Sequence, residues 1–270
     1  MRTAIVTLLL GRPYWLAWHD LCGPGWRAYA DRHGYDLIPI DQPLDVTPRA
    51  MARSPAWQKC LVLQPSIAGK YDRIVWLDAD IVINEDAPAV TSAVPIEKIG
   101  AVDEFVYPSP EAYRAFWQRM IAQTEACNPT LARIWQSHLD PGDYHGFWGL
   151  PRRGGHIVQT GVLVLSPRHH RQVLEHVYYS YENKGGAELS YEMRPLSFEI
   201  QERNLQHWID PRFNATFNAI LSTANAESRI STQDQLFDLI RRSLSSNYFL
   251  HFAAHQEMLA AAKTALSVPA

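Results

Sequence analysis

The chain has few cysteines and no hydrophobic run long enough to cross a membrane. Its 270 residues include three cysteines, Cys22, Cys60 and Cys127. An odd, widely spaced set of this kind predicts neither a disulfide framework nor a cysteine metal site. The apolar run at residues 4–10 is too short for a transmembrane helix and lacks the cleavage site of a secretory signal. We therefore expect a cytoplasmic protein without a transmembrane segment, and leave peripheral association with a membrane open.

Two further absences limit the ligands. Lys and Arg number 25 against 28 Asp and Glu, a formal charge of −3, which gives no basic field for a nucleic acid partner. The chain also lacks the G-x-G-x-x-G and P-loop fingerprints, which argues against binding a dinucleotide or ATP by those routes. Aromatic residues are plentiful, with 9 Trp and 12 Tyr, and they suit sugar and nucleobase clefts as well as an apolar core.

The first forty residues read as strand, helix and strand. The continuous apolar run at residues 4–10 is typical of a strand buried on both faces. A helical pattern at residues 14–33 and a second strand at 34–40 complete a right-handed βαβ unit. This pattern predicts an α/β fold, a single three-layer α/β/α sandwich of Rossmann-like type around a mixed, mostly parallel central sheet.

We find no repeat and no linker that would divide the chain. One domain over residues 1–270 is expected, with a nucleotide-binding half at 1–100 and an acceptor half with a C-terminal helix at 101–270. Residues 140–149 are rich in glycine and aromatics and are expected to form a loop, either an acceptor-site rim or an ordinary surface loop. Residues 189–206 are expected to be helical, with an interruption at Pro195.

The stretch at residues 71–83 is the centre of the chain. An apolar strand at 74–77 runs directly into Asp78 and Asp80 and then resumes as an apolar strand. Burying an unpaired carboxylate is costly, and the partner that suits Asp-x-Asp best is Mn²⁺ or Mg²⁺, which accepts oxygen ligands and leaves positions for substrate phosphates. The pattern predicts a metal–diphosphate site; the alternative is a solvated turn at the end of a strand.

Three other polar positions point to the same kind of site. Gln159 and Gly161 interrupt an apolar strand at residues 157–165, and a glycine inside a strand lets a ligand approach the backbone closely. His251 lies on a short apolar strand near the C-terminus, where it is either a metal ligand or a structural histidine. Lys59, on a predicted short helix, is either a partner of Asp78 or the donor, or a solvated lysine.

Two glutamates precede the break at Pro195. Glu188 and Glu192 are candidates for the catalytic side of the cleft. A carboxylate there could act as a general base or stabilise a positively charged centre. Both residues are equally compatible with solvated charges on a helix.

Taken together, these segments resemble the GT-A glycosyltransferases, and more narrowly the galactosyl-, mannosyl- and xylosyltransferase group with an Asp-x-Asp motif. The matching segments occur in the family's order across most of the chain, at residues 54–59, 75–80, 159–165, 210–214 and 250–252. The chain departs from the pattern at Gln159, where the family often has Asn, and at Ala254, where a glycine commonly follows.

The resemblance implies a hexosyltransferase that uses a nucleotide-sugar donor, expected to be a UDP-hexose, and a glycan or other hydroxyl acceptor. It implies Mn²⁺ or Mg²⁺ held by Asp78, Asp80 and His251, with His255 as a weaker competitor for the histidine role. Donor-binding residues would be Thr7, Leu8, Gly11, Tyr14, Lys59, Asp78 and Gly161, and catalytic ones Glu192, Glu188 and Gln159. The sugar, the acceptor and the stereochemistry stay open, because one scaffold supports many activities.

Two other functions are compatible with the sequence. Residues 78–82 also fit the Asp-x-Asp signature of haloacid-dehalogenase-like phosphatases, with Asp78 as nucleophile. However, two strands precede the motif here, whereas it normally ends the first strand of that fold. The third reading is a non-catalytic module that binds a sugar nucleotide or a glycan.

Overall fold

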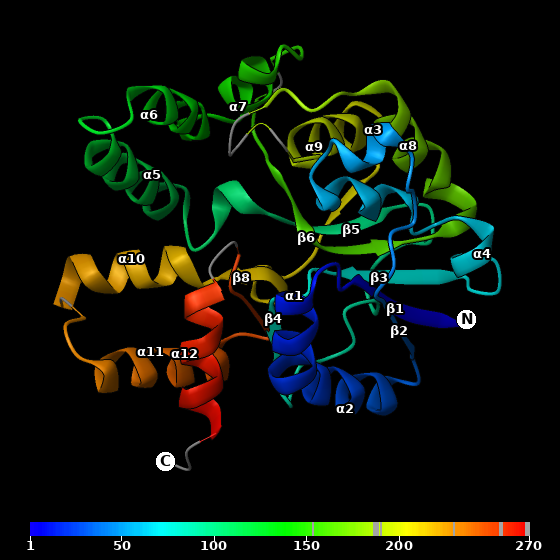
Figure 1. The fold of residues 1–270 in the computed structure, drawn as a ribbon, viewed down its shortest axis with the longest axis horizontal. Helices are drawn as coiled ribbons and strands as arrows, with labels where there is room; N and C mark the ends of the chain where they lie inside the picture. The colour runs from blue at the N-terminus through cyan, green and yellow to red at the C-terminus, as the bar shows by residue number, and fades with distance from the viewer. Residues whose placement is uncertain (153, 186–188, 190, 229, 254–255, 268–270) are drawn as a thin grey trace.

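The computed structural model describes residues 1–152, 154–185, 189, 191–228, 230–253 and 256–267. Within them the chain forms an α/β sandwich with a main sheet and a smaller sheet, and the chain passes from one to the other after the central strand β3 (Arg73–Leu77) (Figure 1). The α/β fold with a mixed central sheet is confirmed. The division of the chain into a nucleotide-binding half and an acceptor half stays a prediction.

The main sheet of the described residues has six strands in the order β2-β1-β3-β6-β5-β7. Strands β1, β2, β3, β5 and β7 run in one direction, and β6 alone runs against its neighbours β3 and β5. The sheet is therefore mixed and mostly parallel. Its strands are β1 (Thr3–Leu8), β2 (Asp36–Ile40), β3 (Arg73–Leu77), β5 (Ile99–Asp103), β6 (Val158–Leu165) and β7 (Gln206–Trp208).

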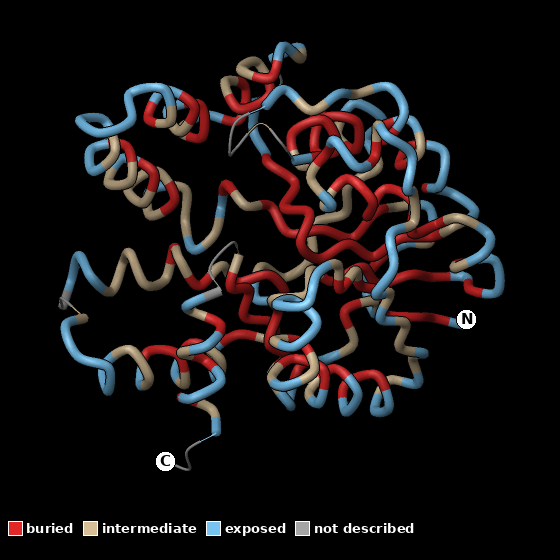
Figure 2. Tube along the Cα trace, in the orientation of Figure 1, coloured by how far each residue is buried: buried red, intermediate tan, exposed pale blue. Residues whose placement is uncertain are grey.

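The two faces of this sheet are covered by different helices. Alternate side chains of a strand point to opposite faces, so Ile5 packs on one side of the sheet and Ala4 and Val6 on the other. Helix α2 (Gly23–His33) covers the first face, and η2 (Pro55–Leu61), α8 (Pro167–Ser180) and α9 (Met193–Glu202) cover the second. Figure 2 shows the resulting buried layer running through the central strands.

The first strand of the smaller sheet directly follows the Asp-x-Asp motif. In the described residues it has three strands in the order β4-β9-β8, namely β4 (Ile81–Ile83), β9 (Phe249–His251) and β8 (Ala215–Thr216). The C-terminal helices α10 (Phe217–Ser228), α11 (Gln233–Ser246) and α12 (Gln256–Ser267) lie around it (Figure 1). Because β4 follows Asp80 directly, this sheet brings a C-terminal strand to the motif.

A helical unit separates β5 from β6. It consists of η3 (Glu104–Val106), α5 (Pro110–Thr124), α6 (Pro129–Gln136), η4 (Ser137–Leu139) and α7 (Pro141–Trp148). The expectation of a loop at residues 140–149 is wrong. Asp140 accepts hydrogen bonds from the N–H groups of Gly142 (2.8 Å) and Asp143 (3.1 Å), and Gly149, with φ 91°, ends the helix.

Pro195 does not interrupt its helix as expected. It lies in the first turn of α9, where a backbone N–H has no partner within the helix. The remaining short helices are α1 (Arg12–Ala17), a π-helical turn η1 (Trp18–Cys22), α3 (Pro48–Met51), α4 (Pro65–Ala68) and η5 (Pro211–Asn214).

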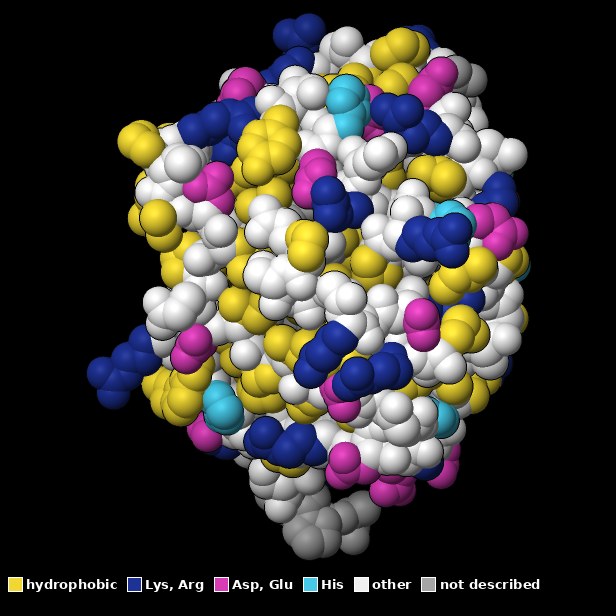
Figure 3. Space-filling model, turned by 90° about the vertical axis from the view of Figure 1, so that its right-hand side faces the viewer, with side chains coloured by type: hydrophobic (Ala, Val, Ile, Leu, Met, Phe, Trp, Pro, Cys, Tyr) yellow, Lys and Arg dark blue, Asp and Glu magenta, His cyan; other side chains and the backbone are white. Residues whose placement is uncertain are grey.

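On the face shown in Figure 3, basic and acidic side chains lie interspersed among apolar ones. This distribution agrees with the small net charge of the sequence. Among the described residues, no helix has both the length and the apolar character needed to cross a bilayer.

Candidate active site

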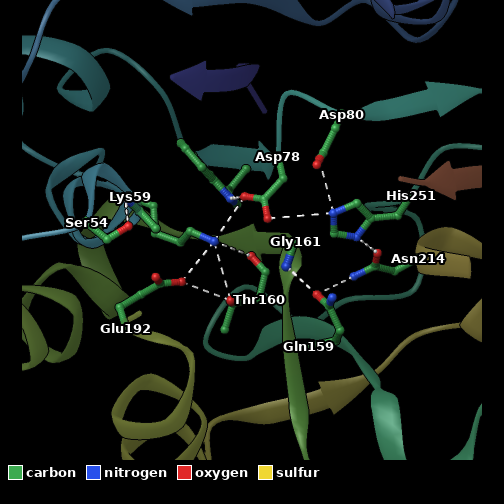
Figure 4. A network of polar contacts seen from close by, with 12 residues as sticks. Ser54, Lys59, Asp78, Asp80, Gln159, Thr160, Gly161, Glu192, Asn214 and His251 are labelled. Carbon is green, nitrogen blue, oxygen red and sulfur yellow. Dashed lines mark hydrogen bonds and ion pairs between the residues drawn. The ribbon is translucent and has the colours of Figure 1, made fainter. Parts of the chain in front are cut away.

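Asp78 and Asp80 lie where the two sheets meet. Every residue of β3 is buried, and the strand ends as the N–H of Asp78 donates to the carbonyl of Gly161 on β6, at 2.9 Å. Two residues later the carbonyl of Asp80 accepts from the N–H of Phe252, just after β9, at 3.0 Å. The backbone therefore fixes both carboxylates between β6 and β9 (Figure 4).

Lys59 joins Asp78 to Glu192. Its buried Nζ lies 3.0 Å from Asp78 Oδ1 and 2.9 Å from Glu192 Oε1, and also donates to the carbonyl of Thr160 at 3.3 Å. Burial alone would lower the pKa of Lys59, but the two carboxylates outweigh it and raise the pKa above its ordinary value. Lys59 is therefore a permanent cation that compensates two acidic groups, and the reading of a solvated helix lysine does not hold.

One oxygen of Asp78 is fully used by these contacts. Besides Lys59, the indole Nε1 of Trp76 donates to Asp78 Oδ1 at 2.8 Å. The other oxygen, Oδ2, faces His251 Nε2 at 3.9 Å. Asp78 thus presents Oδ2 to the cleft, while Lys59 and Trp76 hold Oδ1.

The ring of His251 is oriented by two amide side chains (Figure 4). The N–H of Gly161 donates to Gln159 Oε1, so this atom must be an oxygen. The same oxygen accepts from Asn214 Nδ2 at 2.8 Å, and Asn214 Oδ1 then lies 2.8 Å from His251 Nδ1. Because a carbonyl oxygen only accepts, Nδ1 carries a proton and Nε2 holds the lone pair of the neutral ring.

His251 Nε2 faces Asp80 directly. The distance from Nε2 to Asp80 Oδ1 is 3.1 Å, yet Oδ1 is buried and has no hydrogen-bond donor in the described part of the chain. Burial lowers the pKa of His251, but the Asp80 carboxylate outweighs it and raises the pKa. Two atoms with lone pairs in contact need a cation between them, either a proton or a metal ion.

These residues fit a divalent metal. Asp78 Oδ2, Asp80 Oδ1 and His251 Nε2 are the oxygen and imidazole ligands that Mn²⁺ accepts, and neighbouring ligands on a six-coordinate ion lie roughly 3 Å apart. No group of three or more His, Cys, Asp and Glu residues within the described ranges forms a ready-made metal cage. The protein would therefore supply only part of a coordination shell, as in sites that bind substrate phosphates.

Gly161 makes room for His251. A Cβ atom at this position would lie 2.5 Å from His251 Cε1 and 2.9 Å from His251 Nδ1. The space that the missing side chain leaves is thus filled by the imidazole ring. A donor-binding role for Gly161 stays a prediction.

The predicted nucleoside-binding residues lie at the end of β1, beside β3. Thr7 is buried and Leu8 is partly buried, whereas Gly11 is exposed and Tyr14 lies on the exposed helix α1. None of the four makes a hydrogen bond or ion pair with the Asp78–Lys59 cluster among the described residues, so their role stays a prediction. Glu188, Ala254 and His255 lie outside the described residues.

Sequence reasoning missed two members of the cluster. Thr160 Oγ1 donates to Glu192 Oε1 at 3.0 Å, and Trp76 binds Asp78. Asp78 directly follows β3 and is two residues after Trp76. Because alternate residues of an extended chain share a face, the sequence spacing indicates this contact. A small cleft also adjoins the amide pair, lined by Gln159, Asn214, Glu104, Tyr107 and Phe116 among others.

Similar structures carry the same fold. A glycosyltransferase involved in the glycosylation of the major capsid of PBCV-1 matches with a TM-score of 0.56 and 12% identity, covering 99% of this chain and 100% of that one. The bifunctional glycosyltransferase WbbM matches with a TM-score of 0.52 and 10% identity, covering 94% of this chain and 46% of that one.

The galactosyltransferase LgtC, solved with donor and acceptor sugar analogues, gives a TM-score of 0.48 at 10% identity, covering 98% of this chain and 96% of that one. The fold assignment rests on the first two. No protein-family model and no curated protein matches the sequence. The chain therefore has the GT-A fold of glycosyltransferases.

Proposed function

We propose that this chain is a metal-dependent hexosyltransferase that moves a sugar from a nucleotide-sugar donor, a UDP-hexose, to an acceptor hydroxyl. The observation that carries the proposal is the convergence of Asp78 Oδ2, Asp80 Oδ1 and His251 Nε2 within a GT-A fold. Two carboxylates from the connection between β3 and β4 meet there with a histidine from β9, about 170 residues later in the sequence, and each keeps an unused lone pair toward the others.

Mn²⁺ or Mg²⁺ held by Asp78, Asp80 and His251 would, when bound, stabilise the negative charge of the departing diphosphate as a Lewis acid. Other side chains of the protein orient these ligands in advance. Lys59 and Trp76 hold Asp78 with Oδ2 toward the cleft, and Asn214 holds His251 with Nε2 toward Asp80. Preorganised groups of this kind need no rearrangement during the reaction.

Glu192 and Gln159 take different parts in this proposal. Glu192 is buried, and its Oε1 is bound by Lys59 and Thr160. Its Oε2 has no hydrogen-bond partner among the described residues, and we assign it to a hydroxyl of the donor sugar. Gln159 uses its carbonyl oxygen for Gly161 and Asn214, so it acts as a positioning residue for His251.

The cleft beside Gln159 and Asn214 has a volume of about 20 Å³, which suits a single acceptor hydroxyl and not a whole sugar. Tyr107 and Phe116 offer apolar surface there and Glu104 offers a carboxylate. If the enzyme inverts the donor sugar, Glu104 is the group of this cleft that can accept the proton of an acceptor hydroxyl.

The test is donor hydrolysis or transfer with a panel of UDP-hexoses, run with Mn²⁺, with Mg²⁺ and after exhaustive treatment with EDTA. We expect release of UDP that requires the metal and is lost in Asp80→Asn. Release of UDP that is unchanged by EDTA would contradict metal dependence.

The two alternatives give different results in parallel assays. Hydrolysis of a general aryl phosphate that is lost in Asp78→Asn would support the phosphatase reading instead. Binding of UDP-hexose without any turnover would support a non-catalytic module.

A further inference from the structure

A second cleft lies on the helical unit, between α6 and α7, away from the metal-binding residues. Its volume is about 330 Å³, and Arg133, Asp143, Phe147 and Arg152 are among its lining residues. This volume is at the small end of the range of ligand pockets. Two arginines and one aspartate leave the lining with a net positive charge, although the whole chain is slightly acidic.

The two arginines of the cleft differ in how they are held. Arg133, on α6, makes no hydrogen bond or ion pair with any residue that the structure describes. Arg152 forms an ion pair with Asp143 and lies flat on α7, because Gly146 has no side chain there. A Cβ atom at position 146 would lie 3.0 Å from Arg152 Cγ. Arg133 is thus available, whereas the exposed guanidinium of Arg152 is paired with Asp143.

A third arginine lies beneath the cleft. Arg194 is buried and donates to Ser137 Oγ at 3.0 Å and to the carbonyl of Tyr144 at 2.6 Å, while its Nη2 lies 3.1 Å from His138 Nε2. Burial and the nearby Arg194 charge lower the pKa of His138 well below its ordinary value, so the ring is neutral and accepts. These partners are uncharged, and Ser137 also lines the cleft. The positive charge of Arg194 therefore adds to the field of the cleft.

The cleft is connected to the candidate active site through the start of α9. Glu192, which binds Lys59, and Arg194, which binds the α6–α7 region, are two residues apart. Their Cα atoms therefore lie within about 7 Å of each other. Figure 1 shows α9 beside α7 at this side of the sheet. A chain of sugars that enters the active site could extend to this cleft.

We propose that the cleft between α6 and α7 binds the anionic group of an acidic sugar residue, a uronic acid or a phosphorylated hexose, in the acceptor glycan. Arginine binds carboxylate and phosphate through two parallel hydrogen bonds, and Phe147 offers an apolar surface to the sugar ring. That the acidic sugar belongs to an acceptor rests on the proposed function; that the cleft binds it does not.

The experiment is a titration of the purified full chain, without metal or nucleotide, with D-glucuronate, glucose 6-phosphate, glucose and inorganic sulfate, followed by NMR or calorimetry. We expect one or both acidic sugars to bind more tightly than glucose and sulfate. Preference between the two acidic sugars identifies the carboxylate or the phosphate as the recognised group. Equal binding of acidic sugars and glucose, or binding of sulfate with no acidic sugar, would overturn the proposal.

Three variants locate the binding. Arg133→Ala should weaken it about tenfold, the loss expected for one charge-assisted hydrogen bond. Asp143→Asn should strengthen it, because Arg152 then loses its internal partner. Arg168→Ala, at an exposed arginine of α8, is the control and should change nothing.

Binding that Arg133→Ala leaves unchanged would place the ligand elsewhere and contradict the assignment. A failed transferase assay together with intact, Arg133-dependent binding would count against the proposed function and leave this site standing.

Discussion

The ammonium group of Lys59 pairs with two carboxylates, Asp78 and Glu192, inside the protein. Its side chain is 5% exposed and that of Glu192 is 2% exposed. Removing one partner of a buried ion pair leaves an uncompensated charge, at a cost of about 3–5 kcal/mol. This residue therefore matters to folding as well as to the cleft.

We expect Lys59→Met to lower the free energy of unfolding by about 3 kcal/mol or more, measured by urea denaturation. The double variant Lys59→Met with Glu192→Gln should recover part of the loss, because the second charge is removed as well. Lys70→Met, at an exposed lysine, should have little effect. A single variant as stable as the parent protein would show that the Lys59 ion pairs are not needed.

Position 161 requires glycine because the His251 ring occupies the space of a side chain. In Gly161→Ala the new Cβ would overlap the His251 ring, 2.5 Å from Cε1. Overpacking of this kind costs about 1–3 kcal/mol, and it should also displace His251 from Asp80 and raise the Mn²⁺ concentration needed for activity. Gly154→Ala, with open space around its Cβ, is the matched control. Unchanged Mn²⁺ dependence in Gly161→Ala would show that this contact does not fix the histidine.

Helix α8 has a buried histidine, His170, in its first turn. His170 Nδ1 accepts from the N–H of Ser166 at 2.8 Å, one turn earlier. Burial lowers the pKa of His170 from 6.5 to about 4. The folded protein therefore holds this ring neutral at a pH where the unfolded chain would protonate it.

This difference predicts a loss of stability in acid. Below about pH 6.5 the unfolded state binds a proton that the folded state does not, so the free energy of unfolding falls as the pH falls. Between about pH 7.5 and about pH 5, protonation of His170 in the unfolded state alone should lower the free energy of unfolding by about 2 kcal/mol. His170→Gln should show a smaller fall over this range, and His169→Gln, at an exposed neighbour, should follow the parent. Equal slopes in all three would refute the assignment.

How far the sequence predicts the elements depends on the kind of signal. Buried strands such as β3 and β6 were predictable, because continuous apolar runs ending in polar residues have few other readings. Helix α7 was not recognised, because its glycine and aromatic content hides a helix that Asp140 and Gly149 delimit. The sequence around Pro195 predicts a helix break because α9 has no side-chain cap that would mark its start at Met193.

The candidate site was predictable in part for a similar reason. Asp78, Asp80 and His251 each lie at or beside a strand end, and the structure brings them together. The ion pairs of Lys59 depend on how η2, the end of β3 and the start of α9 meet. The amide pair that orients His251 depends on how β6, η5 and β9 align across the two sheets. That alignment is set by tertiary packing, which no local pattern reveals.

In the whole molecule, the polar cluster of Asp78, Asp80 and His251 lies where the two sheets meet. The main sheet supplies Gln159, the small sheet supplies His251, and the connection between β3 and β4 supplies Asp78 and Asp80. Asp78, Asp80 and His251 would hold the metal ion, so its binding would stabilise the contact between the two sheets. Binding of ligand to the folded state alone raises its stability, so Mn²⁺ with UDP should raise the melting temperature more than either alone.

The measurement that tests this account most directly is a calorimetric titration of UDP into the protein, with Mn²⁺ and after EDTA treatment, for the parent chain, His251→Ala and the exposed control His169→Ala. We predict UDP binding that requires Mn²⁺ in the parent and the control, and that needs a higher Mn²⁺ concentration in His251→Ala. The diphosphate alone would meet two carboxylates, which explains the requirement. UDP affinity that is equal with and without metal, or equal Mn²⁺ dependence in all three proteins, would contradict the assignment of Asp78, Asp80 and His251 as a metal–diphosphate site.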